Sequence, residues 1–307
     1  MANPRTTRRE ALAALAAGAL PAVALASQAG SARAPERATH APRIPEQPGR
    51  TARTRFAVNV EMWWSSLPFL ERVARAADLG FPAIEFWTWR DKDVPALGRL
   101  CRERGIDVAQ FTAWGFRPRL NDPAQHDAFV AVVEAACATA KTLGAKLLTV
   151  VAGDDREGVT RDEMHRHVAE GLRRAAPVAE RAGMTLVLEP MNGRVDHPGH
   201  CLYGSAAGLA IVRAVGSPAV KLLYDLYHNQ IEEGDLCGRL REGYAELGYV
   251  QVADHPGRHE PGTGEIHYPR VLRELAELGY RGYVGLECTP HGDPFEAARA
   301  VARADRA

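Results

Sequence analysis

The chain has 307 residues, of which 46% are apolar and 25% are charged, and its 38 basic residues balance its 38 acidic ones. These values exclude a disordered or fibrous chain, and the length is enough for one large core. Formal neutrality argues against a protein that coats nucleic acid, which needs a basic surface. The balance hides two unlike parts, because residues 1–54 hold eight arginines against three glutamates (+5), and residues 55–307 hold 30 basic against 35 acidic residues (−5).

The first 29 residues have the pattern of an export signal. Arg8 and Arg9 precede an uncharged run of 16 residues, 11–26, that is rich in Ala and Leu and ends in small residues. This order is typical of a cleaved secretory signal, and the paired arginines favour the twin-arginine route. The run is short for a membrane span, which needs ~20 residues. We expect residues 1–29 to be removed and the mature protein to be periplasmic or extracellular, without a membrane span; the alternative is an Ala-rich tail with chance arginines.

Residues 30–54 are rich in Pro, Arg, Ala and Thr, and Ile44 is their one large apolar residue. Such a segment buries too little surface to fold, so it is predicted to be a disordered linker before a single domain of residues 55–307. The five cysteines are far apart and form no CxxC pair, so we expect most of them to be buried apolar residues. Whether any two are bridged stays open.

From residue 56 onward, short apolar runs alternate with amphipathic stretches. The latter include residues 68–80, 126–144, 163–183 and 268–279. Glycines suited to end helices lie at Gly80, Gly144, Gly183, Gly248 and Gly279. The eight predicted strands are Phe56–Val60, Ala83–Trp87, Asp107–Phe111, Lys146–Val151, Thr185–Glu189, Val220–Asp225, Tyr249–Ala253 and Tyr283–Glu287.

Eight strand–helix units over about 250 residues predict an α/β fold, the (β/α)₈ or TIM barrel. The main competitor is a doubly wound open sheet, which usually has a glycine fingerprint after its first strand. Here the first strand continues into residues 60–64, VEMWW, which contain no glycine. The barrel is therefore the predicted fold.

The last four predicted strands carry polar residues at or near their ends: Glu189, Asp225, Gln251 and Glu287. Side chains alternate along a strand, so Glu189 shares a face with Val187. If that face is the barrel interior, the four residues meet at the rim where barrel enzymes place their reactive groups. The alternative is a set of rim residues paired with Arg and Lys from the loops.

Three carboxylates in a partly dry cavity repel one another and take up protons. A bound divalent cation removes this conflict. Because all the donor atoms would be oxygens, the set favours Mg²⁺ or Mn²⁺ over zinc. The sequence thus predicts a metal ion as cofactor.

Four segments at these strand ends resemble hydroxypyruvate isomerases, which belong to the wider xylose isomerase-like barrel superfamily with ketose epimerases and inosose-processing enzymes. They are LEPMN (188–192), YDLYHNQ (224–230), QVADHPGRHEPGTGEIHY (251–268) and GLEC (285–288). FAVNVEMWW (56–64) and GFPAIEFW (80–87) are similar to that family as well. The resemblance covers about residues 55–300, and the long 251–268 run is its most specific part.

This resemblance implies a metal held by Glu189, Asp225, Gln251 and Glu287, with Glu189 and Glu287 also moving protons. The implied reaction converts hydroxypyruvate to tartronate semialdehyde, and the partner is a small hydroxy-keto acid or sugar. Such an isomerisation needs a base, an acid and a means to stabilise an enediolate. The export leader departs from a family associated with the cytoplasm, which leaves the physiological substrate open.

Four further residues are candidates for substrate contacts. His228 follows Asp225 by three residues, and Arg258 lies in a long Gly/Pro-rich loop, 254–268, of a length typical of lids. The guanidinium of Arg258 suits a substrate carboxylate, although it could instead pair on the surface with Glu260 or Glu265. Glu265 is expected to brace the loop or contact the substrate. Glu85 is a candidate to orient a substrate hydroxyl, with a structural role as its alternative.

Aromatic residues gather near the ends of the first three strands, as a wall for a sugar-like ligand or as core: Trp63, Trp64, Trp87, Trp89, Phe111 and Trp114. Rival functions share parts of this pattern. A ketose 3-epimerase or an inosose isomerase or dehydratase would use the same metal and glutamates. Cleavage of damaged DNA would need a histidine-rich zinc site and a basic groove, and an exported sugar-binding protein would need no intact site. The oligomeric state stays open, a homo-oligomer included.

Overall fold

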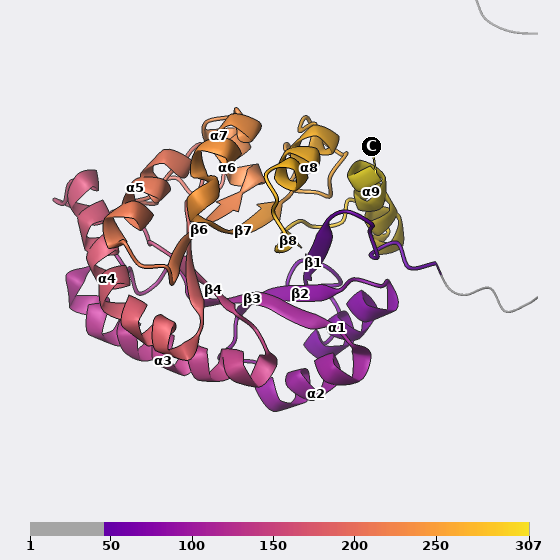
Figure 1. The fold of residues 1–307 in the computed structure, drawn as a ribbon, viewed down its shortest axis with the longest axis horizontal. Helices are drawn as coiled ribbons and strands as arrows, with labels where there is room; N and C mark the ends of the chain where they lie inside the picture. Colours follow the sequence, from indigo (N-terminus) through magenta and orange to yellow (C-terminus); the bar gives the residue numbers. More distant parts are fainter. Residues whose placement is uncertain (1–45, 307) are drawn as a thin grey trace, which may run out of the picture. The chain divides into compact units, whose positions relative to one another are not determined.

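The computed structural model describes residues 46–306, so the predicted signal and most of the predicted linker lie outside the described residues. Within them, eight parallel strands pair in chain order from β1 to β8, and β8 pairs with β1 to close a barrel. Figure 1 shows the helices arranged around these strands. The predicted TIM barrel is confirmed.

All eight predicted strands are present. They are β1 (Arg55–Asn59), β2 (Ala83–Thr88), β3 (Asp107–Trp114), β4 (Leu147–Val151), β5 (Thr185–Glu189), β6 (Val220–Asp225), β7 (Leu247–Val252) and β8 (Tyr283–Leu286). The described α-helices are α1 (Phe69–Asp78), α2 (Val94–Arg104), α3 (His126–Leu143), α4 (Arg161–Ala182), α5 (Ser205–Val215), α6 (Leu226–Glu232), α7 (Leu236–Gly243), α8 (Tyr268–Glu277) and α9 (Pro294–Arg306). Short 3₁₀-helices are η1 (Pro123–Gln125) and η2 (Tyr244–Glu246).

The barrel interior has an apolar layer and a polar layer. The apolar layer is a cluster separate from the core between strands and helices, and it consists of Ala57, Ala83, Ala109, Val187, Leu223 and Tyr249. Two residues further along β1, β2, β5, β6 and β7, the same face carries polar side chains. Strand pairing places Asn59 level with Glu85 and Asp225 level with Gln251. The predicted alternation therefore holds, and the carboxyl half of the barrel interior is polar.

Four of the five predicted glycine stops lie at helix ends in the left-handed region: Gly80 (φ 83°), Gly144 (φ 74°), Gly183 (φ 69°) and Gly279 (φ 85°). Gly248 does not, because it is the second residue of β7. A Cβ there would lie 2.7 Å from the side chains of Val187 and Lys221. Close packing between neighbouring strands, and not a helix end, explains this glycine.

The described end of the predicted linker, residues 46–54, packs on the barrel. The backbone N–H of Gly49 donates to Leu79 O at 2.8 Å, and the backbone N–H groups of Arg53 and Thr54 donate to the carboxylate of Asp305 in α9. The donors of these hydrogen bonds are backbone N–H groups, so the amino-acid composition of the segment does not predict them.

The five cysteines all lie in the described part of the chain and are free, and all except Cys237 are buried. No two of these five cysteines are therefore bridged. None of the helices in residues 46–306 combines the length and apolar character that crossing a membrane requires.

Candidate active site

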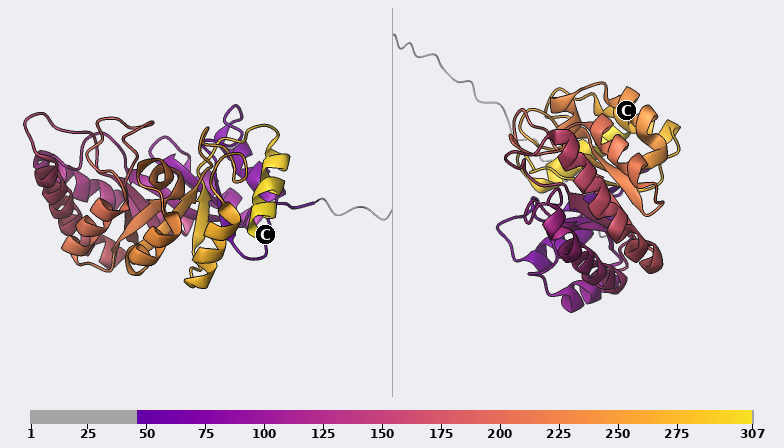
Figure 2. Two further views of the ribbon diagram at one scale, coloured as in Figure 1. Left: turned by 90° about the horizontal axis from the view of Figure 1, so that it is seen from above. Right: turned by 90° about the vertical axis from the view of Figure 1, so that its left-hand side faces the viewer.

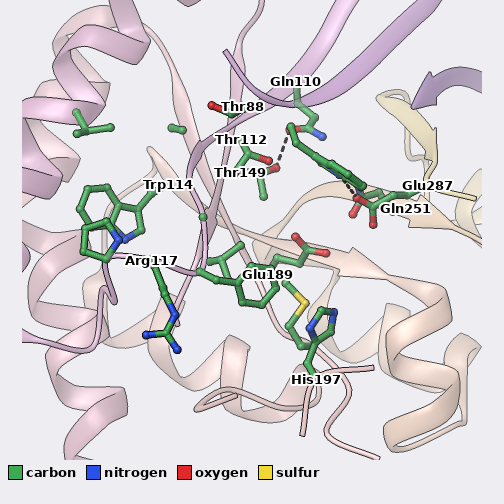
Figure 3. A pocket seen from close by; sticks show the side chains of 18 of the residues that line it. Thr88, Gln110, Thr112, Trp114, Arg117, Thr149, Glu189, His197, Gln251 and Glu287 are labelled. Atoms are coloured by element: carbon green, nitrogen blue, oxygen red, sulfur yellow. Dashed lines mark hydrogen bonds between the residues drawn. The ribbon is translucent and has the colours of Figure 1, made fainter. Parts of the chain in front are cut away.

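A cavity of about 790 Å³ lies at the carboxyl ends of the strands. Long connecting loops gather on one side of the barrel in Figure 2 (left). Glu189, His228, Gln251, Arg258 and Glu287 all line this cavity. In Figure 3, Glu189 points into it, and Gln251 and Glu287 lie together at one end.

The predicted metal ligands come together at that end. Glu189, Asp225, His228 and Glu287 each place one ligand atom within 4.8 Å of the others. Each of these side chains is at most 5% exposed. Gln251, which is 1% exposed, pairs in register with Asp225 and lines the same cavity. We refer to Glu189, Asp225, Gln251 and Glu287 as the acidic cluster.

The acidic cluster carries more negative charge than the neighbouring basic side chains neutralise. Burial raises the pKa of Glu189 well above its usual range, and the charges of Glu287 and Asp225 raise it further. Burial also raises the pKa of Asp225 to about 7, although Arg258 opposes the shift. Raised values of this kind show that the ionised carboxylates are not fully compensated by the protein alone.

The atoms of the cluster fit a hard divalent cation. Within residues 46–306, the carboxylate of Glu189 accepts no hydrogen bond. The Oε1 atom of Gln251 is buried without a hydrogen-bond partner, while its Nε2 donates to Glu85 Oε1 at 3.0 Å. The free atoms of this set are oxygens, which Mg²⁺ and Mn²⁺ prefer.

His228 is oriented as a hydrogen-bond donor toward the cluster. Asn192 Oδ1 accepts from the backbone N–H groups of Val195 and Asp196, which fixes Asn192 Nδ2 as the atom that lies 2.6 Å from His228 Nδ1. Nδ1 is thus an acceptor, and burial lowers the pKa of His228 well below its usual range. The neutral ring carries its proton on Nε2, 3.7 Å from Asp225 Oδ2. His228 Nε2 also lies 3.5 Å from Arg258 Nη2, so it faces both the cluster and the guanidinium.

Arg258 reaches into the cluster and does not pair on the surface with Glu260 or Glu265. Its Nη2 donates to Glu287 Oε2 at 2.6 Å and lies 3.9 Å from Asp225 Oδ2. The guanidinium therefore supplies part of the missing positive charge. It also holds one side of the Glu287 carboxylate.

Glu85 lies beneath the cavity and does not line it. The side chain is fully buried and is not among the residues that line the cavity, so this structure does not place it against a substrate. Its carboxylate instead accepts four hydrogen bonds, from Asn59 Nδ2 (3.1 Å), Gln110 Nε2 (3.2 Å), Tyr249 OH (2.7 Å) and Gln251 Nε2 (3.0 Å). Glu85 thus lies where the structural role, its alternative in the sequence analysis, would place it, and it accepts the hydrogen bond that holds Gln251.

Glu265 also lies outside the cavity. It is exposed and accepts a hydrogen bond from Gln230 Nε2 at 3.1 Å, which ties the loop to α6. Of the aromatic residues, Trp87 and Trp114 line the cavity, whereas Trp63 and Phe111 are buried in the core.

Two site residues escaped the sequence analysis in their actual roles. Trp87 donates its indole N–H to Glu287 Oε1 at 2.8 Å, so both oxygens of that carboxylate are held. Asn192 fixes the ring of His228. Asn192 belongs to the LEPMN run, so its signal was present, but only the fold brings it beside His228 of α6.

Comparisons with known proteins agree with this geometry. The family described as xylose isomerase-like TIM barrel matches residues 73–305. A putative hydroxypyruvate isomerase of Streptomyces coelicolor is 36% identical over 82% of this chain and 98% of its own length. The hydroxypyruvate isomerase of Escherichia coli is 32% identical and the 2-oxo-tetronate isomerase of Cupriavidus necator 34% identical, each over 77% of this chain and 93% of its own.

Among solved structures, one described as an AP endonuclease of family 2 from Brucella melitensis is 30% identical to this chain. It superimposes with a TM-score of 0.75, covering 80% of this chain and 96% of its own.

Proposed function

Because the chain belongs to the xylose isomerase-like TIM barrel family, we propose that it is a metal-dependent isomerase that moves a proton between adjacent carbons of a hydroxy-carbonyl substrate. The observation that carries the proposal is the acidic cluster: three buried carboxylates and a free amide oxygen, from four consecutive strands, at one end of a single cavity. Hydroxypyruvate, converted to tartronate semialdehyde, is the first substrate to assay, because two of the relatives are named for it.

Glu189, Asp225, Gln251 and Glu287 would hold Mg²⁺ or Mn²⁺. Bound there, the ion would act as a Lewis acid that stabilises the negative charge developing on the substrate oxygens.

Glu189 and Glu287 move the proton. Both carboxylates face the cavity, from the ends of β5 and β8, so the ionised one removes a proton from one carbon and the other, which starts protonated, gives its own proton to the neighbouring carbon; exchange with solvent then restores both. Trp87 and Arg258 fix the carboxylate of Glu287 from two sides. His228 Nε2–H donates to a substrate oxygen and so favours one orientation of the carbonyl.

The first test removes the two proton carriers. We expect Glu189→Gln and Glu287→Gln each to lower kcat on hydroxypyruvate by at least ~100-fold, the low end of general acid–base contributions. Circular dichroism and thermal unfolding should show an intact fold. Chelation should abolish wild-type turnover, and Mg²⁺ or Mn²⁺ should restore it. Near-wild-type turnover in either variant, or in chelated enzyme, would refute the mechanism.

A ketose 3-epimerase or an inosose isomerase or dehydratase would use the same cluster, so the assay should include ketoses and follow the product by NMR. Endonuclease activity is disfavoured, because it needs a histidine-rich zinc site and a basic groove, whereas Gln251 offers an oxygen and residues 55–307 carry −5. A sugar-binding protein without activity would bind ketoses and turn over none of them.

A further inference from the structure

Arg258 enters the cavity from a backbone conformation that is rare for a residue with a side chain. Its φ of 55° lies in the left-handed region, where a Cβ is unfavourable, so contacts around it must hold the conformation. Its backbone N–H donates to Asp254 O at 3.0 Å, and its carbonyl oxygen accepts from the backbone N–H of Thr289 at 2.9 Å. The loop after β7 and the segment after β8 therefore hold this residue together, and its side chain lines the cavity.

One nitrogen of the Arg258 guanidinium faces most of the candidate metal site. Nη2 lies 2.6 Å from Glu287 Oε2, 3.5 Å from His228 Nε2 and 3.9 Å from Asp225 Oδ2. These three side chains, with Glu189, are the ones whose atoms lie close enough together to hold a metal ion. An Mg²⁺ ion bound to Glu287 Oε2 at ~2.1 Å would lie within about 5 Å of Nη2. The guanidinium and the ion would thus be neighbours with charges of the same sign.

The positive charge of Arg258 acts on the ion through surroundings that hold little water. The three carboxylates of the acidic cluster carry three negative charges when ionised, Arg258 carries one positive charge, and the ion would bring two. These carboxylates are at most 5% exposed, so solvent screens the charges weakly. Arg258 therefore stabilises the ionised cluster before the ion binds, and it repels the ion that arrives.

The guanidinium has space to turn away from Glu287. The Arg258 side chain is 22% exposed and borders the cavity of about 790 Å³. Its guanidinium carbon lies 5.1 Å from the centroid of the Tyr227 ring, in a cation–π contact that does not depend on Glu287. When an ion neutralises Glu287, the guanidinium can keep this contact while it turns toward the cavity.

We propose that Arg258 and the divalent cation compete for the acidic cluster. Without the ion, the guanidinium pairs with Glu287 and faces Asp225. Binding of the ion weakens this pairing and frees the guanidinium to bind a carboxylate of the substrate. Arg258 thus sets the metal affinity of the site. This inference rests on the proposed metal-dependent function and adds to it how the metal centre is regulated.

The test compares the affinity for Mn²⁺ of the purified full chain with that of two variants, by electron paramagnetic resonance after metal has been removed with a chelator. Arg258→Gln removes the positive charge, whereas Arg258→Lys keeps it. We expect the Kd for Mn²⁺ to fall by about tenfold or more in Arg258→Gln, because the ion loses a repelling neighbour. In Arg258→Lys the Kd should stay within about threefold of the wild-type value, because the charge remains.

Thermal unfolding is the second measurement. In chelator, the Tm of Arg258→Gln should lie below that of the wild type, because the acidic cluster has lost its basic partner. In Mn²⁺ the difference should shrink, because the variant binds the ion more tightly and binding stabilises the folded state. If Arg258→Gln does not fold, Arg258→Met replaces it, since methionine is also neutral and packs well against an aromatic ring such as that of Tyr227.

Arg117→Gln is the matched control. The Arg117 side chain also lines the cavity, but its guanidinium pairs with Asp154 at 2.8 Å, so its loss should leave the Kd for Mn²⁺ unchanged. An unchanged or higher Kd in Arg258→Gln, or an equally low Kd in Arg258→Lys, overturns the inference while the isomerase function stands. A wild-type chain that binds no Mn²⁺ overturns the metal-dependent function and the inference with it.

Discussion

Gln251 is held by a hydrogen bond that decides which of its atoms is free. Its Nε2 donates to Glu85, so its Oε1 is the atom left without a partner. Glu85 accepts from four donors, which favours its ionised form, whereas burial favours the protonated form and raises its pKa to about 7. Gly285 leaves room for it, because a Cβ there would lie 2.3 Å from Glu85 Oε2. Glu85 is thus a positioning residue for the metal ligand above it.

Replacing Glu85 by Gln should weaken metal binding. The amide offers one acceptor oxygen and adds a donor that faces the donors of Asn59, Gln110, Tyr249 and Gln251, so Gln251 loses its fixed orientation. Loss of such support typically costs ~10–100-fold in metal affinity. We expect the Kd for Mn²⁺, measured by electron paramagnetic resonance, to rise by about tenfold or more. Glu103→Gln, an exposed carboxylate on α2, is the control, and an unchanged Kd in Glu85→Gln would contradict the assignment.

Depth in the barrel explains why the sequence predicted the acidic cluster but could not decide between the two roles of Glu85. Glu189 is the last residue of β5, whereas Glu85 lies three residues before the end of β2. Both side chains point inward, and the alternation of side chains along a strand predicts this direction alone. How far each residue lies below the rim depends on the register between strands, which the sequence does not disclose.

At the scale of elements, the loop between β7 and α8, residues 253–267, is held in place by hydrogen bonds to Asp254. We call this loop the arch. Asp254 Oδ1 accepts from the backbone N–H groups of His255 and Ile266, and Oδ2 accepts from Gly262 N–H, at 2.8–3.0 Å. The backbone N–H of Arg258 donates to Asp254 O at 3.0 Å. The arch therefore holds Arg258 against the acidic cluster.

Loosening this arch should impair catalysis through Arg258. In Asp254→Asn, an amide nitrogen would face a backbone N–H, and an unmade buried hydrogen bond costs ~1–3 kcal/mol. We expect faster proteolysis within residues 255–266 and a fall in kcat/KM of about tenfold. Asp235→Asn, on an exposed turn outside the cavity, should change neither. Wild-type protease resistance in Asp254→Asn would show that the carboxylate does not organise the loop.

The elements themselves were predictable because each strand is a short apolar run between amphipathic helices. Errors arose where a residue serves a contact that is distant in sequence. Gly248 packs against Val187 of β5 and Lys221 of β6, and backbone N–H groups of residues 46–54 donate to the backbone of Leu79 and the carboxylate of Asp305. The composition of a segment shows its propensity, but not the partner that overrides it.

At the scale of the whole molecule, the neutral total conceals a buried concentration of negative charge. Residues 55–307 carry −5, and the acidic cluster places three carboxylates where water is scarce. When folding raises the pKa of a carboxyl group, the folded state binds the proton more tightly than the unfolded state does. The unfolded chain releases that proton near pH 4, whereas the folded protein holds it to a higher pH. The contribution of such a group to the free energy of unfolding of the metal-free protein therefore falls as pH rises through this interval.

Asp225 makes this effect measurable, because burial raises its pKa to about 7. Without metal, the Tm of the wild type should fall relative to that of Asp225→Asn as pH rises from about 4 to 7, since the amide has no proton to lose. With Mn²⁺, the Tm of the wild type should instead rise relative to that of Asp225→Asn as pH rises, because the ion requires the ionised carboxylate and stabilises only the folded state. Thermal unfolding of both proteins over this pH range, in chelator and in Mn²⁺, checks both statements. Parallel curves in chelator would mean that Asp225 already has its charge compensated, and a metal would then no longer be needed to explain the cluster.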